Sequence, residues 1–215
     1  MIIEGISVIF DFDGTLVKTN FYKKNLYTEL FSNNNNISEK EINSIVKKYY
    51  GSVNRKTIIS KILKSSLDAG DFSEKNIEHY FSLYSQKYIQ YSSSCNEISG
   101  TTEILRLLSS NINIFINTAN PESDIRTIIS RRKWDCYFKG IFGSPRNKAE
   151  IINHIVKLEN LNRSSFFMVG DNQEDFDSAL ATRINFIGII NSESDFDKTP
   201  DKVINSVSSL LEVIK

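Results

Sequence analysis

Two aspartates two residues apart stand near the start of the sequence, in the segment DFDGT of residues 11–15. In an extended chain, residues two apart point the same way, so the carboxylates of Asp11 and Asp13 can reach one ligand. One carboxylate can attack a phosphorus atom while the other carries a proton to the leaving oxygen. Gly14 permits a sharp turn that brings backbone amides near a phosphate. The segment therefore predicts phosphoryl-transfer chemistry.

Three further polar residues follow apolar runs of the kind that form buried strands. They are Thr118, Lys148 and Asp171. Ligands of open parallel sheets bind beyond the carboxyl ends of the strands, so these residues are expected to meet the two aspartates. A threonine hydroxyl and a lysine ammonium suit the oxygens of a phosphoryl group. Asp11 and Asp171, with a backbone carbonyl and water, suit Mg²⁺, which offsets the repulsion between carboxylates and phosphate.

The apolar pattern predicts strands that alternate with helices. Strands are expected at Ile6–Phe10, Ile112–Ile116, Tyr137–Phe142, Phe166–Val169 and Phe186–Ile190. Helices are expected around residues 104–108, at Pro121–Arg132, Lys148–Leu158 and Phe176–Ala181, and as one amphipathic C-terminal helix from Val203 to Ile214. Such alternation favours a parallel sheet with right-handed crossovers. The predicted fold class is α/β, with a Rossmann-like three-layer core around a parallel sheet.

A helical segment interrupts this alternation after the first strand. From about Phe21 to Tyr91, apolar residues recur at helical spacing, and we expect a small bundle of about four helices. An excursion of this length is too long for a loop and indicates a separate, lid-like domain. The expected division assigns residues 1–17 and 97–215 to the catalytic core. Residues 18–96 are assigned to a small α-helical cap domain.

The composition is that of an ordinary globular protein. The 215 residues are 40% hydrophobic and 24% charged, and 26 basic residues balance 26 acidic ones, which gives no reason to expect a nucleic-acid partner. No apolar run approaches the roughly 18 residues of a membrane span, and the N-terminal segment MIIEGISVIF lacks the features of a signal peptide. Two isolated cysteines, Cys95 and Cys136, favour a reducing compartment. We therefore expect a soluble, cytoplasmic protein.

Four motifs together resemble the haloacid dehalogenase-like superfamily of phosphohydrolases. They are DFDGTL from Asp11, Thr118 after an apolar strand, Lys148 within GSPRNKAEII, and VGDNQEDFDSA around Asp171. The motifs stand in the family's order and span almost the whole chain. The helical insert resembles the family's C1-type cap, which places the chain near the phosphoglycolate phosphatase and β-phosphoglucomutase branch.

The resemblance implies roles for five residues in and beside the first three motifs. Asp11 would be the nucleophile that forms an aspartyl-phosphate. Asp13 would be the general acid and base, and its backbone carbonyl would also bind Mg²⁺. Thr118 and the backbone amide of Ala119 would bind phosphate oxygens. Lys148 would neutralise Asp11 and the transferred phosphoryl group.

The fourth motif would complete the metal site. The resemblance implies that Asp171 ligates Mg²⁺ directly, whereas Asp175 orients Lys148 or a metal-bound water. Asn172 is a further candidate to hold such a water. Two positions depart from the family's pattern, since Lys18 stands where many relatives carry an acid and Asn120 follows the threonine motif. The role of Asn120 stays open.

The expected activity is a Mg²⁺-dependent phosphatase that hydrolyses a small phosphorylated metabolite, with a sugar phosphate as one candidate. The same residues would serve a phosphomutase of the β-phosphoglucomutase type, in which the phosphoryl group returns to a second hydroxyl before water intervenes. A dehalogenase is disfavoured because Asp13 supplies an acid and base that this reaction does not need. A non-catalytic phosphate-binding or signalling protein on the same fold is a remote alternative. We expect neither a nucleic-acid nor a membrane partner, and the oligomeric state is not indicated.

Overall fold

The computed structural model describes residues 5–34, 36–51, 53–192, 194 and 196–214. It divides into two compact units, which we call the core unit and the helical unit. The core unit comprises Met1–Thr19 and Ser93–Lys215, and the helical unit comprises Asn20–Ser92. The cap expected from the sequence was slightly longer, from residue 18 to residue 96.

A parallel sheet forms the centre of the core unit, and within the described residues it has six strands. These are β1 (Ser7–Phe10), β2 (Asn113–Pro121), β3 (Gly140–Ser144), β4 (Phe166–Gly170), β5 (Asn185–Ile189) and β6 (Val203–Ile204), in the order β3-β2-β1-β4-β5-β6. Every neighbouring pair in this order is parallel, which confirms the predicted sheet type. The strand order reverses between β1 and β4, the position at which open α/β sheets bind ligands.

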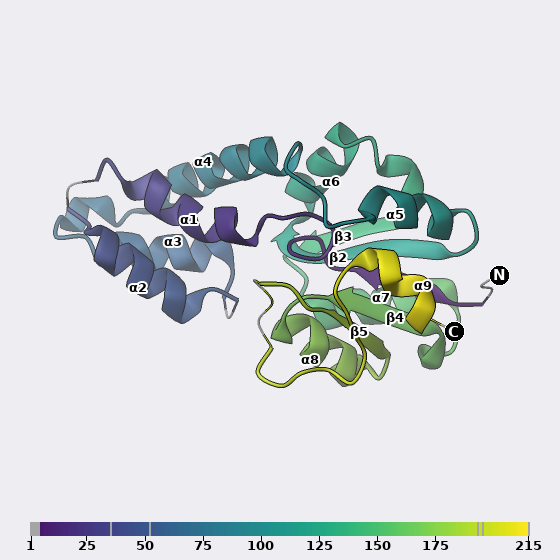
Figure 1. Ribbon diagram of the computed structural model, residues 1–215. Helices are drawn as coiled ribbons and strands as arrows, with labels where there is room; N and C mark the ends of the chain where they lie inside the picture. Colours follow the sequence, from purple (N-terminus) through teal and green to yellow (C-terminus); the bar gives the residue numbers. More distant parts are fainter. Residues whose placement is uncertain (1–4, 35, 52, 193, 195, 215) are drawn as a thin grey trace. The chain divides into compact units, whose positions relative to one another are not determined.

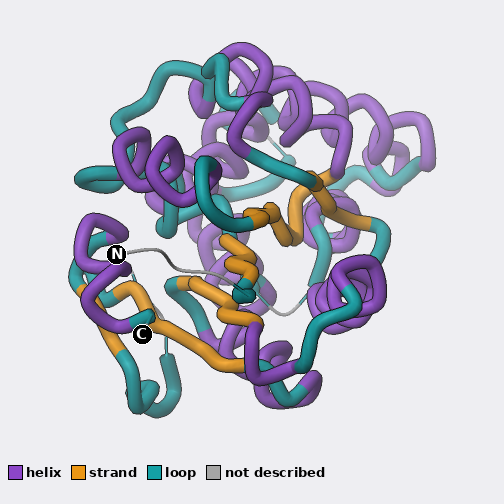
Figure 2. The backbone as a smooth tube through the Cα atoms, turned by 90° about the vertical axis from the view of Figure 1, so that its right-hand side faces the viewer, coloured by secondary structure: helices purple, strands orange, loops and turns teal. Residues whose placement is uncertain are grey.

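Helices cover both faces of this sheet (Figure 1). On one face, α5 (Thr101–Ser109) packs against β2, and α6 (Glu122–Arg131) packs against β2 and β3. On the other face, α7 (Lys148–Glu159) and α8 (Gln173–Thr182) pack against each other and against the sheet. Figure 2 shows the strands as a layer between helices. The predicted three-layer α/β core is therefore confirmed.

The central strands are buried because both faces of the sheet are covered. All residues of β1 and β4 are buried. A cluster of buried side chains joins the sheet to α7 and α8, and it includes Ile9, Phe115, Ile155 and Phe166. Full burial of a side chain of this size contributes about 1.5–3 kcal/mol. This packing fixes the ends of the strands relative to the starts of the helices.

Several element boundaries differ from the prediction, and one difference concerns the site. The strand β2 continues to Pro121, so Thr118 lies within the strand and not after it. The register between β2 and β3 shifts between Asn117 and Pro121, an irregularity of the kind that redirects side chains next to active sites. The helix α8 begins three residues earlier than expected, at Gln173.

The C-terminal segment was predicted as one amphipathic helix, and this prediction is wrong. Its first part forms β6, which pairs with β5, and the Ile190 N–H donates to the Ile204 carbonyl at 2.9 Å. The α-helical part is limited to α9 (Leu210–Val213), which follows a 3₁₀ turn. Ile204, Val207 and Leu210 are all buried. Their spacing of three residues imitates the apolar face of a helix, although two of them lie outside the α-helix.

The described part of the helical unit contains four α-helices, in agreement with the prediction. They are α1 (Asn20–Phe31), α2 (Glu39–Tyr49), α3 (Arg55–Lys64) and α4 (Glu74–Ser92). Ser38 and Glu41 form a capping box at the start of α2, and Asn54 caps α3. The unit has an aromatic core of its own, in which the ring centroids of Tyr27 and Tyr84 lie 4.8 Å apart. In the described residues, no helix has both the length and the apolar character needed to cross a membrane.

Two residues of α7 allow the contribution of the apolar cluster to be measured. Ile155→Ala should lower the free energy of unfolding by about 2–5 kcal/mol because the side chain is fully buried. Leu158→Ala should change it by less than about 0.5 kcal/mol because Leu158 is 57% exposed. Urea unfolding followed by circular dichroism measures both values. Equal losses in the two variants would contradict the role given to the cluster.

Candidate active site

Polar residues from separate motifs gather at the carboxyl ends of the central strands. Asp11 follows β1, Thr118 lies near the end of β2, and Asp171 follows β4. Lys148 is the first residue of α7. Each of these four residues is at most 3% exposed. Because buried polar groups are unfavourable unless they are paired, such a gathering in one place indicates a functional site.

The turn after β1 positions the first two aspartates. The Asp11 N–H donates to the Val169 carbonyl at 2.9 Å, which continues the pairing of β1 with β4 by one residue. Gly14 has a φ of +71°, a conformation that glycine adopts without steric strain. Its N–H donates to the Val17 carbonyl at 2.8 Å and closes the turn. The turn thereby holds Asp11 and Asp13 in fixed positions at the end of the central strand.

Lys148 connects two carboxylates. Its Nζ donates to Asp11 Oδ1 at 2.9 Å and to Asp175 Oδ1 at 2.6 Å. A capping box of Asn147 and Glu150 fixes the start of α7, where the helix dipole opposes a positive charge. The two carboxylates therefore account for the position of the ammonium. Burial alone would lower the pKa of Lys148, but the carboxylates outweigh this effect and hold the pKa well above its usual value.

Asp11, Asp171 and Asp175 form a buried acidic cluster, in which one carboxylate oxygen of each lies within 4.8 Å of the others. Asp175 is fully buried, and its Oδ2 finds no hydrogen-bond partner among the described residues. Burial raises the pKa of Asp175 well above its usual value; Lys148 opposes this, and the other two aspartates add to it. The Lys148 ammonium cannot balance three carboxylates. The oxygen donors, the excess negative charge and the unsatisfied oxygen all fit a hard divalent cation.

Gly170 provides the space that the Asp175 carboxyl group occupies. A Cβ on residue 170 would overlap the carboxyl carbon of Asp175. Asn172 brings Asp175 to this point, because it caps α8 and its Oδ1 accepts a hydrogen bond from the Asp175 N–H at 3.2 Å. The Asn172 Nδ2 also donates to Asp171 Oδ1 at 3.4 Å. The segment after β4 thus positions two acids through one asparagine and one glycine.

Two short hydrogen bonds hold the carboxylate of Asp13. Thr19 Oγ1 donates to Asp13 Oδ1 at 2.5 Å, and Asn120 Nδ2 donates to Asp13 Oδ2 at 2.5 Å. Asn120 Nδ2 also lies 3.0 Å from Thr118 Oγ1, to which it donates. Asp13 is not a member of the acidic cluster described above. A metal contact through its backbone carbonyl stays a prediction.

Sequence reasoning identified some of the contacting residues and missed others. It selected the acids and the lysine, but it did not find Thr19 or Asn117, and it gave Asn120 no role. Asn117 is fully buried, and its Nδ2 donates to the Lys148 carbonyl at 3.0 Å, which ties β2 to the start of α7. The predicted phosphate ligand Ala119 is exposed beside Thr118. No sequence pattern around Thr19 or Asn117 indicates a role, because each residue bonds to a residue of another segment, Asp13 and Lys148 respectively.

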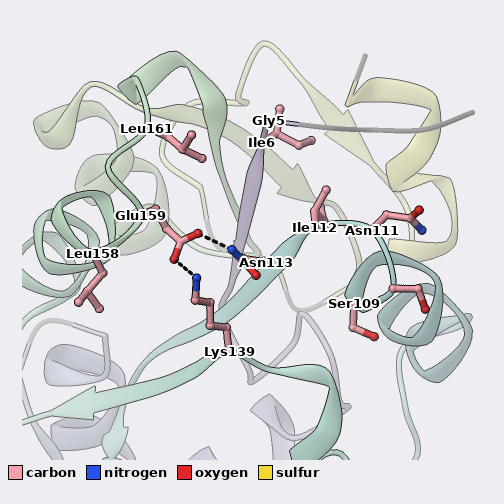
Figure 3. A pocket seen from close by; sticks show the side chains of 11 residues that line it. Gly5, Ile6, Ser109, Asn111, Ile112, Asn113, Lys139, Leu158, Glu159 and Leu161 are labelled. Carbon is pink, nitrogen blue, oxygen red and sulfur yellow. Dashed lines mark hydrogen bonds and ion pairs between the residues drawn. The ribbon is translucent and has the colours of Figure 1, made fainter.

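A separate hollow of about 500 Å³ lies at the amino ends of the strands (Figure 3). Glu159 is one of the residues that line this hollow, and its carboxylate lies 2.8 Å from Lys139 Nζ and 2.6 Å from Asn113 Nδ2. This carboxylate therefore has an ion-pair partner at one oxygen and an amide donor at the other. Because the motif residues lie at the opposite, carboxyl ends of the strands, we take that end as the candidate active site.

The fold and the site together define an α/β protein with a group of buried carboxylates at the carboxyl ends of its central strands. A family model described as haloacid dehalogenase-like hydrolase matches residues 8–189. The chain therefore belongs to this family of hydrolases, as its motifs predicted. Among proteins with curated descriptions, none matches this chain in sequence.

Solved structures share the fold at low sequence identity. The chain is similar to a predicted phosphoglycolate phosphatase from Haemophilus somnus, with 17% identity, a TM-score of 0.76 and 97% of each chain covered. It is similar to CbbY from Rhodobacter sphaeroides in complex with phosphate, with 14% identity, a TM-score of 0.73, and 98% of this chain and 96% of that chain covered. A haloacid dehalogenase-like protein from Streptococcus pneumoniae has 22% identity, a TM-score of 0.67 and 98% of each chain covered. At these identities, the likeness shows the fold alone.

Gly170 offers a test of how the site is packed. Gly170→Ala should destabilise the protein by about 1–3 kcal/mol and reduce its activity, because the added methyl group displaces the Asp175 carboxylate. Gly188, its register partner on β5, is a matched control, since a Cβ there has no neighbour closer than 3.1 Å. The melting temperature and the hydrolytic activity should both fall more in Gly170→Ala than in Gly188→Ala. If Gly170→Ala melted at the wild-type temperature, the described packing of Asp175 would be wrong.

Proposed function

We propose that the protein is a Mg²⁺-dependent phosphatase that hydrolyses a small phosphorylated metabolite through an aspartyl-phosphate. The observation that carries this proposal is the buried Lys148 ammonium, which bridges Asp11 and Asp175 beside Asp171. A carboxylate that attacks a phosphate must overcome repulsion between two anions. The Lys148 ammonium and a cation in the acidic cluster would both reduce this repulsion. The phosphate bound to CbbY on the same fold supports a phosphoryl site.

Asp11 is the proposed nucleophile. While Lys148 neutralises Oδ1, the other carboxylate oxygen attacks phosphorus, and the bond between phosphorus and the ester oxygen breaks. Thr118 Oγ1 and the backbone amide of Ala119 bind the phosphoryl oxygens during this transfer. The product of the step is a phosphorylated Asp11 and a leaving group that requires a proton.

Asp13 is the proposed general acid and base. It donates a proton to the leaving oxygen in the first step, so that an alcohol departs. In the second step it removes a proton from the water that attacks the phosphorylated Asp11. This attack breaks the new oxygen–phosphorus bond, releases inorganic phosphate and restores both carboxyl groups.

Asp11, Asp171 and the Asp13 carbonyl are the residues proposed to hold Mg²⁺, while Asp175 orients Lys148. When bound, Mg²⁺ would offset the negative charge of the carboxylates and of the phosphate. The unsatisfied Asp175 Oδ2 supports a cation, or a water held by one, next to the acidic cluster. Asn172, which donates to Asp171, is placed to orient such a water.

We further propose that the helical unit acts as a cap that selects the organic part of the substrate. The chain passes between the two units at Thr19–Asn20 and at Ser92–Ser93. Where it leaves and re-enters the core unit, the Lys18 N–H donates to the Asn96 carbonyl at 2.9 Å, so the two connections are tied together. Two adjacent connections of this kind suit a hinge that closes during transfer and opens to admit water. The proposed partners are small molecules in the cytoplasm.

The central test is release of phosphate from a panel of phosphorylated metabolites and from a generic aryl phosphate. Asp11→Asn should abolish turnover on every substrate while the protein stays folded, because the amide is not a nucleophile. Asp13→Asn should lower the rate by about 10²–10⁴-fold, the usual contribution of a general acid and base. Near-wild-type turnover by Asp11→Asn would show that the nucleophile is another group. If a sugar phosphate were isomerised without release of free phosphate, the proposed phosphatase activity would be wrong and a phosphomutase activity would take its place.

The metal is tested by removal and by one substitution. A chelator should abolish activity, and added Mg²⁺ should restore it. Asp171→Asn should raise the Mg²⁺ concentration needed for half-maximal rate, because it removes a charge but keeps an oxygen donor. Mg²⁺ should also raise the melting temperature of the wild type, since a ligand that binds the native state alone stabilises it. Full activity in excess chelator, with an unchanged Mg²⁺ titration for Asp171→Asn, would refute the metal site.

A further inference from the structure

Asn120 is a buried residue of the site to which neither the motifs nor the proposed mechanism gives a role. It is the penultimate residue of β2 and is 4% exposed. Its Nδ2 donates to Asp13 Oδ2 at 2.5 Å and to Thr118 Oγ1 at 3.0 Å. An amide nitrogen carries two hydrogens, so both bonds can form together. One nitrogen therefore joins the proposed proton donor to the proposed phosphate ligand.

We propose that Asn120 is the positioning residue that sets the place of Asp13 relative to the phosphoryl group. The inference rests on the proposed function, because it assigns Asn120 to the delivery of a proton to the leaving oxygen. The Asn120 backbone N–H also donates to Thr118 Oγ1, at 3.3 Å. The threonine hydroxyl is thus held from two sides by the residue that holds Asp13.

An amide has the right chemistry for this task. It carries no charge, so it can hold a carboxylate without adding to the charge of a pocket that already contains an ammonium and three further acids. Thr19 holds the other oxygen of Asp13, so two donors from distant parts of the sequence define the plane of the carboxylate. A small displacement of a proton donor from its acceptor reduces the rate strongly, since proton transfer requires hydrogen-bond distance.

The role of Asn120 predicts a dependence on the leaving group. An alkoxide leaves poorly without a proton, so hydrolysis of an alkyl phosphate needs a well-placed acid. The 2,4-dinitrophenolate ion is stable without a proton, so its phosphate ester does not need that acid. Loss of the Asn120 donor should therefore slow the first ester far more than the second. A merely structural role would slow both esters alike.

The experiment compares kcat/KM for the best alkyl phosphate of the panel with kcat/KM for 2,4-dinitrophenyl phosphate. Asn120→Ala should reduce the first value by about 10–100-fold, a part of the about 10²–10⁴-fold that general acid–base catalysis supplies. It should reduce the second value by less than about threefold. Asn120→Asp keeps the shape but replaces the donor by an acceptor, and it should change the ratio in the same direction. If Asn120→Ala does not fold, the ratio of the two esters in Asn120→Asp provides the test.

Asn185→Ala is the matched control. Asn185 donates to the Ser164 and Phe166 carbonyls at the amino ends of the strands, so its loss should lower stability and leave the ratio of the two esters unchanged. If the wild type is active and the Asn120 variants keep its ratio of kcat/KM for the two esters, the role of Asn120 is rejected while the proposed function stands. Failure of both variants to fold would assign Asn120 to the fold instead. If the wild type hydrolysed neither ester, the proposed function would fail and the inference with it.

Discussion

A buried ammonium shared by two carboxylates is the interaction on which the candidate site depends. Lys148 is 2% exposed and bonds to Asp11 and Asp175, which are also buried. Removing one member of such a group would leave an uncompensated buried charge, which is strongly unfavourable. The three charges must therefore be buried together, and this requires fixed positions for β1, α7 and α8. The apolar cluster between the sheet and these helices supplies that rigidity.

The same site works against stability in one respect. Three carboxylates and one unsatisfied oxygen lie close to one ammonium, so the negative charge exceeds the positive charge within the acidic cluster. A domain selected for stability alone would fill this space with apolar or neutral groups. A cation that binds the cluster would offset the excess negative charge and stabilise the native state through the contacts that are proposed to serve catalysis. Functional sites commonly trade stability for activity in this way.

The sequence predicted those parts of the fold and site that local patterns determine. Buried strands have apolar runs, and the binding of ligands at the carboxyl ends of parallel strands was enough to predict that Asp11, Lys148 and Asp171 meet. The contacts of Asn117 and Asn120 could not be predicted, because asparagine is common in turns and their partners belong to other motifs. The strand β6 was missed because its residues continue an apolar spacing of three that a helix shares. Local patterns predict elements and their ends, whereas polar contacts between elements depend on packing in three dimensions.

The sheet order separates the two tasks of the proposed reaction. Asp11 follows β1, which lies between β2 and β4. Asn120, which bonds to Asp13, and Thr118, the proposed phosphate ligand, come from β2, whereas Asp171 and Asp175 follow β4. The groups of β2 proposed to serve the proton and the phosphate and the acids that follow β4 therefore lie on opposite flanks of Asp11. Asn120 bonds to Asp13, whereas Lys148 bonds to Asp11 and Asp175, so a substitution at Asn120 removes no direct partner of the Lys148 ion pairs.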